Sequence, residues 1–142
     1  MDEKILSYAG FWKRFAAAVI DGLITNISGF IVGFIFGFSY GFSLNTDKGL
    51  EVFGAILGIL ITWVYYAAME SSAKQATIGK IALGIIVTDL NGNRISFARA
   101  TGRHFAKLLS AITIGIGFLM AGFTKKKQAL HDIVAECLII NK

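Results

Sequence analysis

The sequence predicts an all-α membrane protein with two transmembrane helices, a third apolar segment, a small cytoplasmic β-hairpin and a C-terminal amphipathic helix. Of the 142 residues, 55% are hydrophobic and 16% are charged, whereas roughly a quarter of the residues in soluble domains are charged. The hydrophobic residues form long uncharged runs, and the basic residues lie at the ends of these runs. This pattern indicates one membrane domain over residues 1–142, with no nucleic-acid partner. The net charge of +5 suits an anionic bilayer surface.

The first predicted span covers residues 15–42, in which Asp21 is the one charged residue. Its length exceeds the about 20 residues that a helix needs to cross a bilayer. The run follows Asp2 and Glu3 and is longer than the apolar core of a signal peptide, so we expect it to remain as a membrane anchor.

The second predicted span covers residues 52–69, between Glu51 and Glu70, after a short turn over residues 43–50. Aromatic residues mark the start of the first span and the end of the second, as in the aromatic belt of membrane proteins. They are Phe11, Trp12, Trp63, Tyr65 and Tyr66. We therefore expect a helical hairpin with these two ends on the same side of the membrane.

A polar stretch, "IIVTDLNGNRISF", follows the second span. Its β-branched residues surround an Asn-Gly turn at Asn91 and Gly92, which favours a β-hairpin over residues 84–98. The alternative is an interfacial helix followed by a loop.

The third apolar segment, residues 105–123, ends just before three consecutive lysines. If it crosses the membrane, nine of the 14 basic residues lie on the side of the N-terminus; if it turns back, 13 do. The positive-inside rule therefore favours a re-entrant segment and a cytoplasmic N-terminus. Gly115 and Gly117 are expected where two half-helices meet. A simple crossing is the alternative.

The tail "QALHDIVAECLIINK" has polar and apolar residues on different sides of a helix, with His131, Asp132 and Glu136 on the polar side. We expect an amphipathic helix along the cytoplasmic membrane surface.

Arg14 and Asp21 are the first candidate site residues. Seven residues apart, they project from nearly the same helix face, but a rise of about 10 Å is too long for an easy salt bridge. Each therefore needs another partner or water. A carboxylate within the membrane usually faces the protein interior or a hydrated path; the alternative is that Asp21 simply reaches interfacial water.

The stretch "ARATGRHFAK" supplies candidate partners. Arg99, Arg103 and Lys107 form a basic stripe, which either binds lipid phosphates or lets Arg103 or His104 reach Asp21 or Asp132. His104 and His131 can relay protons near neutral pH or serve as hydrogen-bonded surface residues. With a single cysteine and scattered carboxylates, neither a metal site nor a cofactor is expected.

Glycines recur every four residues in the first span, at Gly29, Gly33, Gly37 and Gly41. This spacing makes a groove that another helix can approach closely. Gly54 and Gly58 in the second span offer a matching surface, so the packing occurs either within one chain or between subunits of a homo-oligomer.

Three stretches resemble the RDD family of bacterial integral membrane proteins: "GFWKRFAAAVIDG", "ATIGKIALGIIVTDLNGNRISFARATGR" and "GFL…KKKQALHDIVA". The arginine and two aspartates for which that family is named correspond to Arg14, Asp21 and Asp132. "SSAKQAT" lacks the proline or glycine often found before that threonine, and "AECLII" lacks the family's small-Thr-aliphatic ending. The resemblance implies a multi-pass protein of the bacterial inner (cytoplasmic) membrane, in a family with links to cation/proton antiport.

Two functions are consistent with these residues, and enzymatic activity is not expected because no nucleophile–base pair or phosphate loop is present. The first is a transport component that exchanges a monovalent cation such as Na⁺ for protons. Asp21 would bind the cation or the proton in turn, and Arg14 and Asp132 would gate it. The alternative is a non-transporting module that assembles or anchors membrane proteins, with the charges fixing one packing arrangement.

Overall fold

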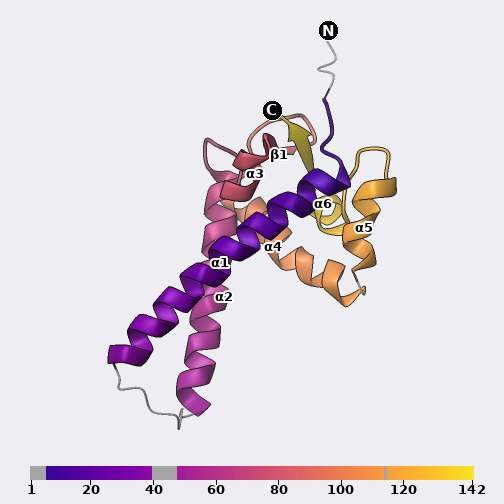
Figure 1. Ribbon diagram of the computed structural model, residues 1–142. Coiled ribbons are helices and arrows are strands. Elements are labelled where there is room, and N and C mark those ends of the chain that lie inside the picture. The colour runs from indigo at the N-terminus through magenta and orange to yellow at the C-terminus, as the bar shows by residue number, and fades with distance from the viewer. Residues whose placement is uncertain (1–5, 40–47, 114) are drawn as a thin grey trace.

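Figure 1 shows a computed structural model of the chain, which describes residues 6–39, 48–113 and 115–142. The fold is mostly helical, as predicted, with a small two-stranded sheet. In chain order the elements are α1 (Phe11–Ser39), α2 (Lys48–Ser71), α3 (Ile78–Ala82), β1 (Ile85–Asp89), α4 (Phe97–Ile112), α5 (Ile116–Phe123), α6 (Leu130–Val134) and β2 (Cys137–Asn141).

The two predicted spans are confirmed as long apolar helices. α1 and α2 have 29 and 24 residues, and both are long and apolar enough to cross a membrane, over Phe11–Ile35 and Lys48–Ser71. Only 6% of each apolar window is buried within the protein, as expected for surfaces that lipid covers. α1 begins before residue 15, the predicted start. Residues 40–47, including most of the predicted turn, lie outside the described residues.

The third apolar segment is broken into two helices, α4 and α5, which are bent by 102° relative to each other. Gly115 begins α5 with a φ of 78°, a left-handed conformation that glycine adopts without steric cost. A Cβ atom on Gly117 would lie 2.7 Å from the Cα atom of Ser110, so α5 packs very closely against α4. The predicted break at these two glycines is confirmed.

The chain enters and leaves this bent pair at the same end of the molecule (Figure 1). β1 precedes α4 and β2 follows α5, yet the two strands pair antiparallel, with Ile85 opposite Asn141. The backbone N–H of Ala9 also donates to the carbonyl oxygen of Ile139 at 2.8 Å. A bilayer core about 30 Å thick cannot separate hydrogen-bonded strands. If α1 and α2 cross the membrane, both ends of the α4–α5 pair therefore lie on the same side of it.

The predicted β-hairpin over residues 84–98 is wrong in its second strand. β1 and the turn are present, and Gly92 has a positive φ of 82°. The chain then enters α4, where the Ser96 hydroxyl accepts from the backbone N–H of Arg99 at 3.2 Å. Ser96 is thus a helix N-cap, and the partner of β1 comes from β2, far along the chain.

The predicted C-terminal amphipathic helix is also wrong. α6 has five residues, the chain turns at Glu136 with a φ of 50°, and β2 follows. Residues 137–140 are all buried, because β2 lies between β1 and the N-terminal segment, where Tyr8 bridges to Ile140. A strand buried on both faces has no polar side, and its short apolar run resembles part of a buried helix.

The core surrounds this sheet, at the end of the molecule where α1 begins and α2 ends (Figure 1). Its buried side chains come from the N-terminal segment, both strands and the adjoining helices: Ala9, Ala17, Ala67, Ile85, Val87, Ile95, Ala100, Cys137 and Ile139. The small alanines let the helix ends approach the sheet, and the charged residues described next lie among them.

Candidate charge network

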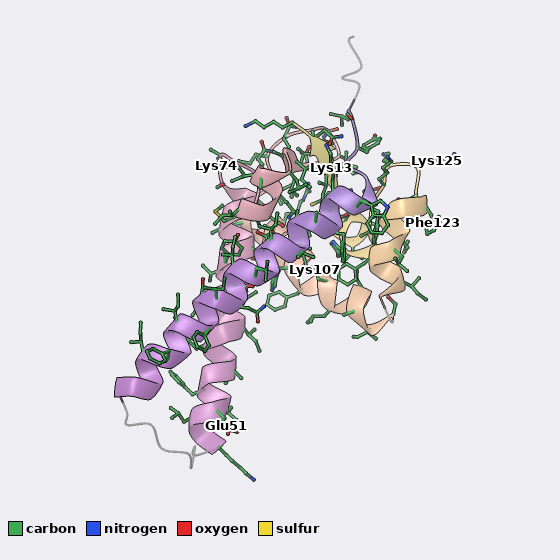
Figure 2. All side chains as sticks on the ribbon, in the orientation of Figure 1. Lys13, Glu51, Lys74, Lys107, Phe123 and Lys125 are labelled. Carbon is green, nitrogen blue, oxygen red and sulfur yellow. The ribbon has the colours of Figure 1, made fainter. Side chains whose placement is uncertain are left out.

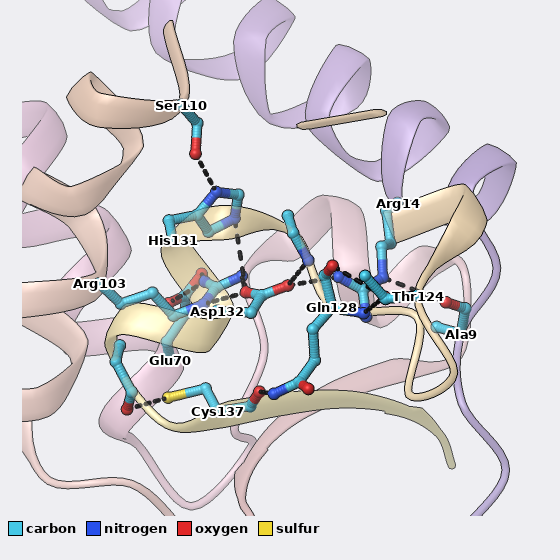
Figure 3. A network of polar contacts seen from close by, with 12 residues as sticks. Ala9, Arg14, Glu70, Arg103, Ser110, Thr124, Gln128, His131, Asp132 and Cys137 are labelled. Carbon is cyan, nitrogen blue, oxygen red and sulfur yellow. Dashed lines mark hydrogen bonds and ion pairs between the residues drawn. The ribbon is translucent and has the colours of Figure 1, made fainter. Parts of the chain in front are cut away.

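Five charged side chains form a continuous buried series, of which Figure 3 shows the larger part. In spatial order they are Arg14, Asp132, Arg103, Glu70 and Lys80. They come from α1, α6, α4, α2 and α3, respectively. The series therefore links five helices that are distant in the sequence, with cations and carboxylates alternating along it.

Arg14 and Asp132, two of the predicted site residues, contact each other directly. Arg14 Nη1 donates to Asp132 Oδ2 at 2.5 Å, and the two side chains are 10% and 0% exposed. Arg14 Nε also donates to the carbonyl oxygen of Ala9 at 3.1 Å. Asp132 Oδ2 further accepts from the backbone N–H of Ala129 at 3.1 Å. The start of α1 is thereby fixed to α6.

Arg103 is the centre of the network. Its Nε donates to Asp132 Oδ1 at 2.9 Å, and its Nη1 donates to Glu70 Oε2 at 2.6 Å. Lys80 forms an ion pair with the same glutamate. Because Arg103 is 1% exposed, both carboxylates hold it in a fixed orientation, which a guanidinium group with five donors suits well.

Burial and ion pairing shift the pKa values of Asp132 and Lys80 in opposite directions. Burial disfavours the charge on Asp132, but Arg103 and Arg14 outweigh it and hold the pKa of Asp132 well below its usual range. For Lys80 burial prevails and lowers the pKa, although Glu70 opposes this shift. Asp132 is therefore ionised at neutral pH, and its charge depends on the two arginines.

His131 extends the network toward α4 (Figure 3). Its Nδ1 lies 3.0 Å from the hydroxyl of Ser110, and its Nε2 lies 3.4 Å from Asp132 Oδ1. Burial, followed by the nearby charge of Arg103, lowers the pKa of His131 to about 3. The imidazole is therefore neutral at physiological pH and acts as a hydrogen-bonding link.

Asp21 is buried but lies outside this ion-paired series. It is 1% exposed, and its carboxylate accepts from Tyr65 Oη at 2.9 Å, Thr77 Oγ1 at 2.6 Å and the Gly79 backbone N–H at 2.8 Å. All three donors are neutral. The hypothesis that Asp21 is sheltered by protein is confirmed. Of the two carboxylates expected for Arg103, it contacts Asp132 and not Asp21.

Two of the three donors to Asp21, Thr77 and Gly79, come from "TIGK", a stretch in which no site was expected. A Cβ atom at Gly79 would lie 2.2 Å from the Ala17 carbonyl oxygen and 2.9 Å from Asp21 Cγ. Only glycine permits this approach of α3 to α1. Lys80, the next residue, binds Glu70. The signal available in the sequence was Asp21 itself, an acid in an apolar segment that needs hydrogen-bond donors from elsewhere in the chain.

The basic stripe separates into three different environments. Arg99 is partly exposed and lies 3.8 Å from Glu136, whereas Arg103 is buried in the network. Lys107 lies over the Tyr66 ring, with its Nζ 3.9 Å from the ring centre. The centres of the His104 and Tyr66 rings are 5.5 Å apart. His104 contacts no carboxylate among the described residues, so its predicted role in the network is not supported.

The glycine row does not pack tightly against α2 within this chain. Gly29 and Gly33 line a cavity of about 480 Å³ between α1 and α2, opposite Gly54 and Gly58. A Cβ atom added to any of these four would meet no described atom within 4 Å. Gly37 belongs to α1, and Gly41 lies outside the described residues. Of the two alternatives, close packing within one chain is not observed at the described positions, and a groove remains there.

Comparison with known proteins places these residues in a family. The sequence pattern of the RDD family matches residues 8–136. The Bacillus subtilis protein YxaI is 34% identical, over 94% of this chain and 97% of its own length. The membrane protein YteJ of the same organism is 27% identical, over 96% of this chain and 82% of its own length. No solved structure matches the chain.

Proposed function

This chain belongs to the RDD family of membrane proteins, and from that premise we propose that it is a non-transporting module that anchors other membrane proteins through helix packing. The observation that carries this proposal is that the carboxylates of the charge network are fully occupied. Both oxygens of Glu70 and both oxygens of Asp132 accept from donors. A carboxylate whose oxygens are all occupied is suited to holding helices together, rather than to binding and releasing an ion.

The energetics of burial support a structural role for the network. Removing one partner from a buried ion pair typically costs about 3–5 kcal/mol, because the remaining charge stays in a nonpolar environment. Each step of an ion-exchange cycle that opened this series would meet such a cost. The network therefore stabilises one arrangement of α1, α2, α3, α4 and α6.

The groove between α1 and α2 supplies the surface on which a partner would pack. Glycines line both of its walls, and the neighbouring side chains are mostly apolar, among them Val32, Phe53 and Leu57. Small residues allow a helix backbone to approach closely in a membrane, where packing rather than hydrophobic exclusion favours association. The occupant that we propose is a transmembrane helix of another membrane protein or of a second copy.

The fold and the charge distribution support one orientation, which is part of this proposal. With α1 and α2 as two crossings and α4–α5 as a re-entrant pair, 13 of the 14 basic residues fall on the side of the sheet. The positive-inside rule then favours an N-terminus and a charge network on the cytoplasmic side of the bacterial inner membrane.

Photo-cross-linking inside the membrane tests the anchoring proposal. A photoreactive residue at Leu57, which lines the groove, should form an adduct with a polypeptide, whereas one at Ile56, which does not line it, should not. Gly33→Ile, which fills the groove, should abolish the Leu57 adduct, and Ala55→Ile, on exposed α2 surface away from the groove, should leave it intact. Adducts with lipid only would contradict the proposal.

Cation/proton exchange is the second candidate, and the burial of Asp21 favours it. Its carboxylate lines one cavity with Arg14 and Arg103, while Tyr65, one of its hydrogen-bond donors, lines the groove between α1 and α2. A buried acid between a cavity and a groove can bind a proton or a cation in turn, and the Arg14–Asp132 pair would act as a gate. The arginines beside Asp21 oppose the approach of a cation, and for this reason we rank exchange second.

A flux assay separates the two functions. Purified protein in proteoliposomes should show no sodium-dependent proton movement if it is an anchoring module. Exchange predicts such movement in the wild-type protein and its loss in Asp21→Asn, with the fold retained. Flux that persists in Asp21→Asn would exclude Asp21 as the exchanging group.

A further inference from the structure

A second pocket, formed by α1, α4 and α5 together with residues near the sheet, has a volume of about 630 Å³. Much of its wall is apolar and includes Phe11, Phe15, Phe118 and Leu119. Phe15 and Leu119 are 53% and 50% exposed, so this wall opens to the surroundings of the helices. In a membrane those surroundings are acyl chains.

Basic groups line the same pocket. Lys107 contacts the face of Tyr66 and, within the described chain, has no carboxylate at ion-pair distance. Two nitrogen atoms of lining residues, Arg14 Nη2 and His104 Nδ1, are buried and lack a hydrogen-bond partner among the described residues. Buried polar atoms are normally hydrogen-bonded. Because arginine nitrogens only donate, Arg14 Nη2 indicates an acceptor that binds at this end of the pocket, and His104 Nδ1 can donate to it in the tautomer that carries its proton there. Figure 2 labels Lys107 where α1, α4 and α5 come together.

The charges around this end leave one cation in excess. Four basic side chains and three carboxylates lie there: Arg14, Lys80, Arg103 and Lys107 with Asp21, Glu70 and Asp132. Glu70 and Asp132 are already paired with the two arginines and Lys80, and Asp21 is held by three neutral donors. Three of the basic residues thus share two carboxylates, whereas Lys107 has no carboxylate at ion-pair distance among the described residues. One negative charge beside Lys107 would balance the whole set.

A ligand that fits these features has one anionic group and a long apolar part. A free phosphate ion would satisfy the basic end but would leave the apolar wall uncovered. An anionic phospholipid satisfies both, because its phosphodiester carries a single negative charge and its acyl chains match the wall. We propose that this pocket binds one anionic phospholipid, with the phosphate against Lys107 and Arg14 and an acyl chain along Phe15 and Leu119.

Native mass spectrometry of the purified full-length protein tests this site with defined lipids. Phosphatidylglycerol should bind at one copy per chain and about tenfold more tightly than phosphatidylcholine with the same acyl chains, because the choline cation cancels the charge of the phosphate and is repelled by Lys107 and Arg14. Lys107→Met keeps the apolar stem and removes the charge, so it should weaken phosphatidylglycerol binding about tenfold. The matched control is Lys74→Met, at an exposed lysine that does not line the pocket (Figure 2).

A second variant tests the apolar wall with all charges in place. Leu119→Trp narrows the pocket and should weaken binding of phosphatidylglycerol but not of glycerophosphoglycerol, which lacks acyl chains. The proposal is overturned if phosphatidylcholine binds equally well, or if Lys107→Met binds phosphatidylglycerol like the wild type. It is also overturned if glycerophosphoglycerol binds as tightly as the lipid, since the site would then hold an anion without its acyl chains.

Discussion

Arg103 is the residue on which the network depends most. We expect Arg103→Met to reduce the free energy of unfolding by about 3–5 kcal/mol, because Glu70 and Asp132 would stay buried without their shared partner. Thermal unfolding in detergent measures this loss. The control is Arg99→Met, four residues earlier on α4, whose 3.8 Å contact with Glu136 is largely exposed and should contribute at most about 1 kcal/mol. Equal effects of the two substitutions would contradict a central role for Arg103.

His131 predicts a pH dependence of stability. Its pKa in the folded protein is about 3, whereas an unfolded histidine titrates near about 6.5. The unfolded state therefore binds a proton first, and stability should be complete above about pH 6.5 and fall as the pH drops toward 3. The slope for one proton is at most about 1.4 kcal/mol per pH unit.

Unfolding of the wild-type protein and of His131→Gln, compared between pH 7.5 and pH 5, measures this contribution. The difference between the two slopes isolates His131 from His104, which titrates in both proteins. The interpretation fails if the two proteins lose stability equally on acidification.

Part of the site could be predicted from single residues, since charges in apolar segments are costly and seldom lie there without a role. That reasoning identified Arg14 and Asp21, whereas Arg103 was identified from the basic stripe and Asp132 from the resemblance to the RDD family. The same reasoning missed Glu70, which stands at the end of an apolar run and was interpreted as a boundary of the membrane. Its partners depend on how α2, α3 and α4 meet, and the spacing of residues along the sequence does not encode this arrangement.

At the level of elements, the close contact of α4 and α5 leads to a prediction for Gly117. Gly117→Ala places a Cβ atom 2.7 Å from the backbone Cα of Ser110, so the two helices must separate. We expect a loss of about 1–3 kcal/mol, as for other overpacked sites. Thermal unfolding measures it.

Gly122→Ala in the same helix is the matched control. Its Cβ atom would meet Phe11 Cβ at 3.9 Å, an ordinary contact. Because alanine favours a helix over glycine by about 1 kcal/mol, this control should be neutral or stabilising. If Gly117→Ala also proved stabilising, α5 would not pack against α4 as described.

The long helices were predictable, and the sheet was not. In a membrane, an apolar run as long as α1 or α2 has few alternatives to forming a transmembrane helix. β1 was recognised from its β-branched residues, but its partner was assigned to the nearest segment across the Asn91–Gly92 turn. The true partner, β2, is separated from β1 by three helices. Nothing in the sequence near either strand indicates that the two strands pair. The run at 137–140 was therefore interpreted as the apolar side of a helix.

For the whole molecule, the sheet predicts which segments share one side of the membrane. In a Cys137→Ala background, Lys126→Cys and Lys74→Cys should react with a membrane-impermeant maleimide only after intact cells are permeabilised. Lys48→Cys, at the start of α2, should react without permeabilisation. Labelling of Lys126→Cys from outside intact cells would rule out the re-entrant arrangement of α4 and α5.

The ion pair between Arg14 and Asp132 joins residues that are 118 positions apart. At a synthesis rate of about 5–20 residues per second, Asp132 is added to the chain roughly 6 to 24 s after Arg14. Until Asp132 is synthesised, Arg14 lacks the carboxylate with which it pairs in the folded protein, and so does Arg103 once it has been made. A nascent chain halted before α6 would thus expose unpaired arginines beside lipid, and synthesis of α6 would supply the missing counter-ion.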